Sequence, residues 1–307
     1  MGGRSLIDRG FHILAVAAGL LVLVILILIA FSTTKQAWPW FSSQGIKIFG
    51  RTWNPAQQQY GALSFMFGTL VTAIIAVVIA VPISVGIALL LTEVVRPKVA
   101  RPIVYVIDLL AVVPSVVFGL WGILVLAPWL ASIYASIASG VGGVPVLNTF
   151  FGSPTSGASF FTAGLILAVM ITPIVTSLSR EVIATVPSIE KEGAFALGAT
   201  RLEMIRGAVW PHSLGGIVGA VLLGVGRAMG ETIAVALVIG SSATITTHLF
   251  SPGDSMPAVI ANQFGEATGT ARAGLMGLGV LLFVITIIIN IAARTYVSRY
   301  SKRMRGL

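Results

Sequence analysis

The chain has 307 residues, of which 56% are apolar and only 9% are charged, and its mean hydropathy is +0.99. A soluble domain carries roughly a quarter charged residues, so this composition excludes one and indicates an integral membrane protein. The chain has no cysteine, which excludes a disulfide or a thiol nucleophile, and its three histidines show no metal-ligand spacing.

Apolar runs long enough to cross a bilayer, which takes about 20 residues, recur along the chain. They predict an all-α membrane protein with six transmembrane helices, near 10–32, 62–91, 103–128, 161–182, 213–240 and 274–298. The first run exceeds the roughly 7–15 residues of a signal-peptide core, and no small-x-small cleavage site closes it. It is therefore expected to be a retained helix.

Lysine and arginine are unequally divided between the two sides that these spans define. One alternating set of termini and loops carries fourteen of the 19 basic residues, the other set carries four, and Arg227 falls inside a span. Because cytoplasmic segments are enriched in basic residues, both termini and the loop between the fourth and fifth spans are expected in the cytoplasm. The net charge of +9 thus reflects membrane orientation, and no nucleic-acid partner is expected.

Three loops are expected on the opposite side, at 33–61, 129–160 and 241–273. The second has no charged residue and is expected to include a short helix lying against the membrane. The first contains aromatic residues expected to form an interfacial cluster, namely Trp38, Trp40, Trp53 and Tyr60. None of the loops resembles a folded domain, so we expect them to receive a partner protein.

The polar segment between the fourth and fifth spans carries the most informative pattern. Residues 188–211 (SIEKEGAFALGATRLEMIRGAVWP) predict two short helices that meet at Gly198. Ser188 is expected to cap the first helix, and Thr200 with Glu203 predicts a capping box for the second. Such an elbow is suited to docking on another protein, with Phe195, Leu197, Leu202, Met204 and Ile205 buried there. The alternative is an amphipathic helix on the membrane surface.

Arg227 and Glu231 are the only opposite-charge pair well inside a predicted span. Their i, i+4 spacing predicts that they share a helix face and pair. A charged side chain at a helix centre costs about 2.5–3.5 kcal/mol on insertion scales, so both are expected to face the bundle interior or an aqueous path. One interpretation is an anion site on a translocation path, where the guanidinium binds an oxyanion through paired donors. The other is a buried pair that fixes helix packing.

A second candidate for the path lies at Pro114 and Ser115, in the third predicted span. The proline is expected to bend the helix. The Ser115 hydroxyl is a candidate donor to a passing anion, and the alternative is a hydroxyl that serves helix packing.

Four patterns resemble known permeases of ATP-binding-cassette (ABC) importers. The spacing of Glu192, Gly198 and Pro211 resembles the cytoplasmic coupling loop of these permeases. Three further stretches resemble helices two, three and five of phosphate-importer permeases, specifically the larger of the two membrane subunits: YGALSFMFGTLVTA (60–73), IDLLAVVPSVVFGLWG (107–122) and GVGRAMGETIAVALVIG (224–240). The resemblance covers most of the chain from Tyr60 to Arg294.

This resemblance implies a type I ABC importer permease fold, similar to MetI. Residues 1–60 would hold an N-terminal helix and external loop, 61–300 the transport core with a coupling loop at 187–212, and 301–307 a basic cytoplasmic tail. The family's intramembrane arginine and glutamate fall on Arg227 and Glu231. The ATPase-coupling residues fall on Glu192, Ala194, Gly198, Ala199 and Pro211.

The implied function is import of inorganic phosphate across a bacterial cytoplasmic (inner) membrane. The implied partners are a homologous permease, a dimeric ABC ATPase that holds ATP and Mg, and an external phosphate-binding protein. The chain lacks a G-x-x-x-x-G-K-[ST] run, so no catalysis by the chain alone and no cofactor or metal in it are expected. Two alternatives remain: a sulfate or molybdate permease, and a stand-alone secondary transporter that couples protons through Glu231.

Overall fold

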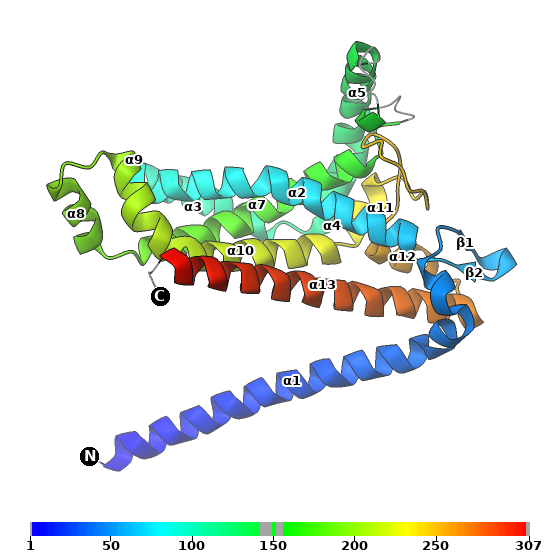
Figure 1. The fold of residues 1–307 in the computed structure, drawn as a ribbon, viewed down its shortest axis with the longest axis horizontal. Coiled ribbons are helices and arrows are strands. Elements are labelled where there is room, and N and C mark those ends of the chain that lie inside the picture. The colour runs from blue at the N-terminus through cyan, green and yellow to red at the C-terminus, as the bar shows by residue number, and fades with distance from the viewer. Residues whose placement is uncertain (1, 142–148, 152–155, 305–307) are drawn as a thin grey trace.

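A computed structural model describes residues 2–141, 149–151 and 156–304, so the last three residues of the predicted basic tail lie outside it (Figure 1). Within the described residues, six helical segments are long and apolar enough to cross a membrane. The predicted number of spans is therefore confirmed. The segments are Asp8–Phe49, Leu63–Val94, Ser115–Gly140, Phe160–Ala184, Arg201–Gly230 and Gly269–Thr295.

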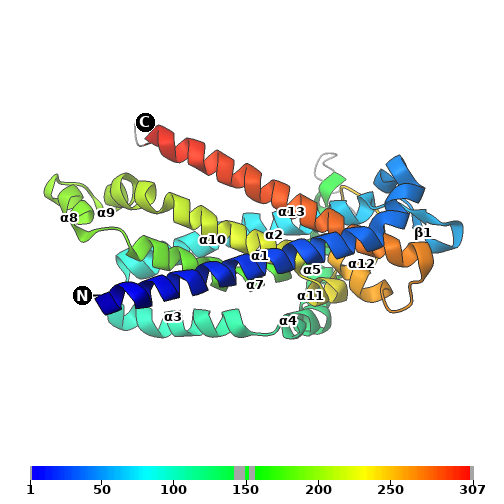
Figure 2. The ribbon, with the colours of Figure 1, turned by 90° about the horizontal axis from the view of Figure 1, so that it is seen from below.

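The bundle consists of long helices that run side by side (Figures 1 and 2). They are α2 (Leu63–Leu89), α3 (Pro97–Val112), α7 (Phe160–Ala184), α10 (Trp210–Gly230) and α13 (Gly269–Met304). Helix α7 contacts α2, α3 and α10, so it lies at the centre of the bundle. Helix α1 (Gly2–Gln44) packs against α13 and diverges from the bundle toward its N-terminus (Figure 1). Its apolar side chains are exposed.

Short elements occupy the two ends of the bundle. One end carries α8 (Ser188–Ala196) and α9 (Arg201–Met204), and we call this the elbow end (Figure 1). The other end carries α12 (Met256–Gln263) and an antiparallel hairpin in which Trp53 of β1 (Trp53–Asn54) pairs with Tyr60 of β2 (Gln59–Tyr60). The 3-10 turns η1 (Gly45–Phe49) and η2 (Pro55–Gln57) flank the first strand. We call this end of the bundle, which carries α12 and the hairpin, the hairpin end.

The third predicted span, 103–128, differs most from the helices of the structure. Helix α3 ends at Val112, and Val113 and Pro114 are extended before α4 (Ser115–Trp121) begins. The predicted bend at Pro114 is therefore a break. After the π-helical turn η4 (Gly122–Leu126), helix α5 (Ala127–Val141) runs across the long axis of the bundle (Figure 1). It corresponds to the short helix expected in loop 129–160, and residues 142–148 and 152–155 of that loop lie outside the described residues.

The aromatic residues near β1 form core contacts, so the predicted interfacial cluster is wrong for Trp40 and Tyr60. Trp40 is fully buried against Gly277 of α13, and its Nε1 donates a hydrogen bond to the Tyr60 carbonyl at 3.1 Å. Trp38 is exposed, as expected for an interfacial residue. The Trp40 ring anchors the end of α1 to α13 because it fills the space beside Gly277.

Asp254 is a buried carboxylate at the hairpin end, in the segment that joins α11 (Ile233–Val238) to α12. Asp254 is 5% exposed, and its Oδ1 accepts a hydrogen bond from the Ser255 backbone N–H at 2.8 Å. Neither of the ion pairs in the described part of the chain involves it. Burial raises the pKa of the Asp254 carboxyl to about 6, against the smaller opposing effect of that hydrogen bond.

Asp254 is expected to make the fold less stable as the pH rises. Because its pKa in the folded state lies above the ordinary value of 3.8, the neutral carboxyl favours the fold at low pH, and this contribution is lost as the pH rises through about 6. The free energy of unfolding of the wild type should fall by up to about 3 kcal/mol between about pH 4 and about pH 7 because of Asp254. We expect this fall to be absent in Asp254→Asn, as measured by thermal unfolding in detergent. Glu266→Gln, an exposed carboxylate, is the control. An unchanged pH profile for Asp254→Asn would contradict this.

Candidate functional site

The elbow has the predicted form of two short helices meeting at a glycine. The chain turns at Gly198, whose φ of +84° lies in the left-handed region that favours glycine. The Thr200 side chain accepts from the Glu203 backbone, and the Glu203 side chain accepts from the Thr200 backbone, so the capping box that starts α9 is confirmed. Ser188 does not cap α8, because helical geometry already begins at Ser188 and Pro187 precedes it in an extended conformation.

The apolar side chains of the elbow divide into two groups. Ile189, Phe195, Leu197 and Leu202 are exposed, and Leu197 is 91% exposed. Met204 is buried and Ile205 packs beside it in a cluster at the elbow end of the bundle, so the expectation that these two face a partner is wrong. Met204 and Ile205 thus anchor the second half of the elbow in the bundle, while Leu202 and the first half present apolar surface.

An ion pair ties the elbow to the end of α2. Lys191 Nζ of α8 lies 2.6 Å from Glu93 Oε1, and the Glu93 side chain is 6% exposed. Glu93 lies in the π-helical turn η3 (Leu90–Val94) that continues α2, and Arg201 donates to the Val94 carbonyl at 3.5 Å. Because Lys191 and Glu93 are 98 residues apart, no local spacing in the sequence signals this contact.

Breaking the Lys191–Glu93 pair is expected to destabilise the elbow. Glu93→Gln leaves Lys191 without its partner, and we expect a loss of about 1–3 kcal/mol, seen as a lower Tm in detergent. The double variant Glu93→Gln, Lys191→Met should lose less than the sum of the single variants, because it leaves no unpaired charge. Additive losses would show that the pair contributes nothing.

The predicted coupling residues lie together in and beside the elbow. Glu192 is exposed on α8, and Ala194 packs against the cluster that holds Met204. The Ala199 N–H donates to the Ala194 carbonyl at 3.1 Å and closes the turn around Gly198. Pro211 is the second residue of α10, after the π-helical turn η5 (Ile205–Val209). The arrangement links an exposed loop directly to the start of α10.

Arg227, near the other end of α10, lines a groove of about 480 Å³ between α7, α10 and α13. Its side chain is exposed to this groove rather than buried in the bundle. The groove also receives two polar residues of α13, Asn290 and Arg294. Neither residue was predicted from the sequence as a site residue. Their i, i+4 spacing was the available signal, because it places them on one helix face.

The predicted pairing of Arg227 with Glu231 is wrong. Helix α10 ends at Gly230, and Glu231 is extended, so the two residues do not share a helix face. The ion pairs within the described residues are Lys191–Glu93 and His212–Glu190. Glu231 Oε1 instead accepts from the Ala234 N–H at 3.4 Å, at the start of α11. The predicted fifth span 213–240 is therefore two helices with a break at Glu231.

The two helix breaks, at Pro114–Ser115 and at Glu231, are brought together by packing of α4 against α11. Gly119 of α4 makes this contact close, since an added Cβ would lie 2.9 Å from Ala234 Cα. Ser115 is half-buried at the start of α4. Ser115 is the first residue of α4 and Glu231 precedes α11, and these two short helices lie side by side (Figure 1).

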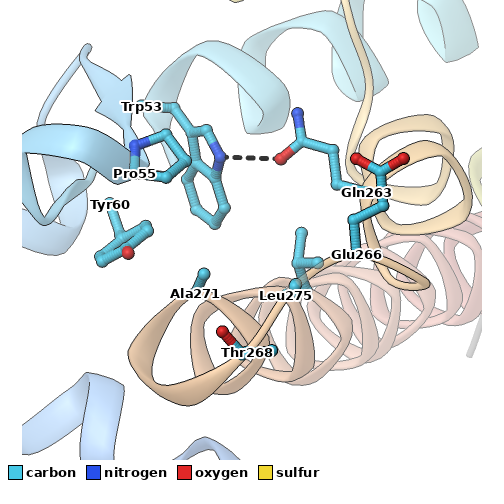
Figure 3. Close-up of a pocket in the computed structure, with 9 residues that line it drawn as sticks. Trp53, Pro55, Tyr60, Gln263, Glu266, Thr268, Ala271 and Leu275 are labelled. Atoms are coloured by element: carbon cyan, nitrogen blue, oxygen red, sulfur yellow. Dashed lines mark hydrogen bonds between the residues drawn. The ribbon is translucent and has the colours of Figure 1, made fainter.

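A second hollow, of about 540 Å³, lies at the hairpin end between β1, β2 and the turn that joins α12 to α13. Trp53 forms one wall, and its Nε1 donates to Gln263 Oε1 at 3.0 Å (Figure 3). Glu266 lies beside Gln263 on the opposite wall, and its side chain is exposed (Figure 3). This hollow combines an aromatic ring, an amide and a carboxylate on the end of the molecule farthest from the elbow.

The model of the binding-protein-dependent transport system inner membrane component family matches residues 80–306. The chain belongs to this family. Relatives include the phosphate transport system permease protein PstC of Xylella fastidiosa strain Temecula1, 42% identical over 98% of this chain and 95% of the relative. PstC of Haemophilus influenzae is 43% identical over 91% of this chain and 90% of the relative. The predicted resemblance to phosphate-importer permeases is therefore confirmed.

Solved structures show the fold of this permease. It is similar to the MetNI methionine ABC transporter in an inward-facing conformation, with a TM-score of 0.55, 16% identity, and coverage of 81% of this chain and 99% of the other. It is also similar to a bacterial ABC transporter involved in import of the polysaccharide alginate, with a TM-score of 0.54, 16% identity, and coverage of 97% and 99%. The predicted MetI-like importer fold is confirmed, and a permease subunit is not catalytic alone.

Proposed function

We propose that this permease is one of two membrane subunits of an ATP-driven importer of inorganic phosphate. The observation that carries the proposal is the near-full-length similarity to proteins named phosphate transport system permease PstC, together with an arginine-lined groove. Guanidinium groups bind tetrahedral oxyanions through paired, charge-assisted donors. In this proposal Arg227 binds the phosphate, and Ser115 and Glu231 border the path at the two helix breaks.

The energy would come from a separate dimeric ABC ATPase that binds ATP and Mg. The elbow is the proposed contact, because Leu197 and its apolar neighbours are exposed and need a partner surface. Closure of the ATPase would move α8, and the Lys191–Glu93 pair and the start of α10 would transmit this motion to the bundle. The elbow and both termini are then cytoplasmic in a bacterial inner membrane, as the basic residues favour.

A homologous permease would complete the path. Helix α1 leaves the bundle, and the apolar side chains along it are exposed. Lipid or another membrane helix would cover such a surface. The Arg227 groove is likewise not enclosed by the described residues. Both features support a partner subunit packed against the bundle.

An external phosphate-binding protein would dock at the hairpin end, opposite the elbow. The hollow beside Trp53 offers the exposed Glu266 carboxylate, which suits a basic side chain of that protein. We expect Glu266→Arg to reduce the stimulation of ATPase activity by the binding protein about tenfold. Asp8→Arg, a charge reversal near the N-terminus, is the control. Full stimulation of the Glu266→Arg complex would contradict docking here.

The remaining alternatives are tested by uptake in cells that lack other phosphate transporters. The proposal predicts labelled phosphate uptake that requires the co-expressed ATPase, survives collapse of the proton gradient while ATP is maintained, and resists competition by sulfate and molybdate. Uptake without the ATPase would support a secondary transporter, and competition by sulfate would support a permease for another oxyanion. Either result would overturn the proposal.

A further inference from the structure

Two arginines from different helices face the same groove without a carboxylate. Arg227 of α10 and Arg294 of α13 line it together with Asn290. The rest of the lining is apolar or glycine: Ile174, Gly219, Leu222, Leu223 and Gly226. Neither arginine takes part in the ion pairs of the described residues. The groove therefore holds two positive charges that no ion pair within the described residues neutralises.

An arginine in a membrane segment needs water or an anion to compensate its charge. Two guanidinium groups on one groove repel each other, and an oxyanion between or beside them removes that repulsion. Asn290 adds a neutral donor: one N–H of its amide donates to the Thr286 carbonyl at 2.9 Å, which leaves the second N–H free to face a ligand. The two guanidinium groups and the amide donor of the groove are thus complementary to a phosphate group.

The two arginines lie at different depths along the bundle. Helix α10 begins and α13 ends at the elbow end (Figures 1 and 2). At 1.5 Å per residue, Arg227 lies roughly 26 Å from the start of α10, and Arg294 lies roughly 15 Å from the end of α13. Gly219 and Gly226 leave the space open, because an added Cβ at either would meet no atom within 4 Å.

We propose that Arg294 and Asn290 form a second phosphate-binding position, on the elbow side of Arg227, which phosphate occupies as it leaves the first. This rests on the proposed function, because the elbow side is then the cytoplasmic side. A lipid headgroup carries the same phosphate chemistry, so the test must separate a free phosphate from a lipid phosphate.

The binding test uses the complete complex in a maltoside detergent, which contains no phosphate. Inorganic phosphate is titrated and thermal unfolding is followed. We expect Arg294→Gln to raise the half-saturating phosphate concentration about tenfold, and Arg294→Lys, which keeps the charge but loses the paired donors, to raise it less. Arg272→Gln removes an arginine from the other end of α13 and should bind as the wild type does. Stabilisation by phosphatidylglycerol and not by phosphate would assign the position to lipid and overturn the release step.

Transport by the same variants in proteoliposomes separates this inference from the proposed function. We expect Arg294→Gln to lower phosphate uptake about tenfold while ATPase stimulation by the binding protein is retained. If the wild-type complex imports phosphate and Arg294→Gln binds and imports it equally well, the second position is wrong and the proposed function stands. If the wild-type complex imports no phosphate, the proposed function fails, and the detergent titration still decides whether Arg294 contributes to a phosphate site.

Discussion

Arg227→Ala is expected to reduce phosphate uptake by about 10- to 100-fold while ATPase stimulation by the binding protein survives. The reason is that a hydrogen bond to a charged group contributes about 1.5–3 kcal/mol, and each 1.4 kcal/mol corresponds to a factor of ten. Arg227→Lys keeps the charge but loses the paired donors, so its uptake should lie between those of Arg227→Ala and the wild type. Uptake of labelled phosphate by the reassembled complex measures both.

The Arg227 result is informative because transport and ATP hydrolysis are measured on the same sample. Arg227 lines the groove and lies far along α10 from the elbow, so its loss should not disturb the coupling contact. Arg272→Ala is the matched control, since it removes an arginine outside the groove. If uptake and ATPase stimulation both persist in Arg227→Ala, the side chain has a structural role and the groove is not the path.

Gly198→Val is expected to give an inserted, correctly folded bundle in which ATP hydrolysis no longer drives uptake. An added Cβ meets no atom within 4 Å, so the effect comes from the backbone, which has a φ of +84°. Such a conformation costs an L-residue about 1–2 kcal/mol, and more for a β-branched side chain. The turn between α8 and α9 should therefore relax to another geometry, and the exposed Leu197 side of the elbow would lose its fit to the ATPase.

A matched pair of substitutions isolates the backbone effect at the elbow. Gly193→Ala adds the same methyl group as Gly198→Ala at an exposed position in helix α8, where φ is not positive and the added Cβ also meets nothing within 4 Å. We expect uptake to fall at least about threefold in Gly198→Ala, further in Gly198→Val, and little in Gly193→Ala. Normal uptake by a well-expressed Gly198→Val complex would refute the coupling role of this turn.

The elbow and the spans could be predicted because their signals are local. Glycine at a left-handed position and the Thr200–Glu203 capping box act over three or four residues, and apolar runs mark the spans directly. The predicted pairing of Arg227 with Glu231 was wrong because the i, i+4 rule assumes a continuous helix, whereas α10 ends at Gly230. Gly230 and the polar residues after it marked this break in the sequence.

Contacts between distant segments could not be predicted from the sequence. Glu93 meets Lys191 only because α2 and the elbow are packed together, and Arg294 meets the Arg227 groove only because α13 lies beside α10. Asn290 and Arg294 share a helix face by their spacing, but which groove that face borders depends on tertiary structure. The domain boundaries at residues 60 and 300, and the roles of the site residues, stay predictions.

The most direct measurement is phosphate uptake into proteoliposomes that contain this permease, its partner permease and the ATPase, with binding protein and labelled phosphate on the outside and ATP with Mg on the inside. We expect uptake that requires ATP and the binding protein, is not matched by labelled sulfate, and falls about 10- to 100-fold in Arg227→Ala. Phosphate uptake that proceeds without ATP, or that is equal in wild-type and Arg227→Ala complexes, would contradict this expectation.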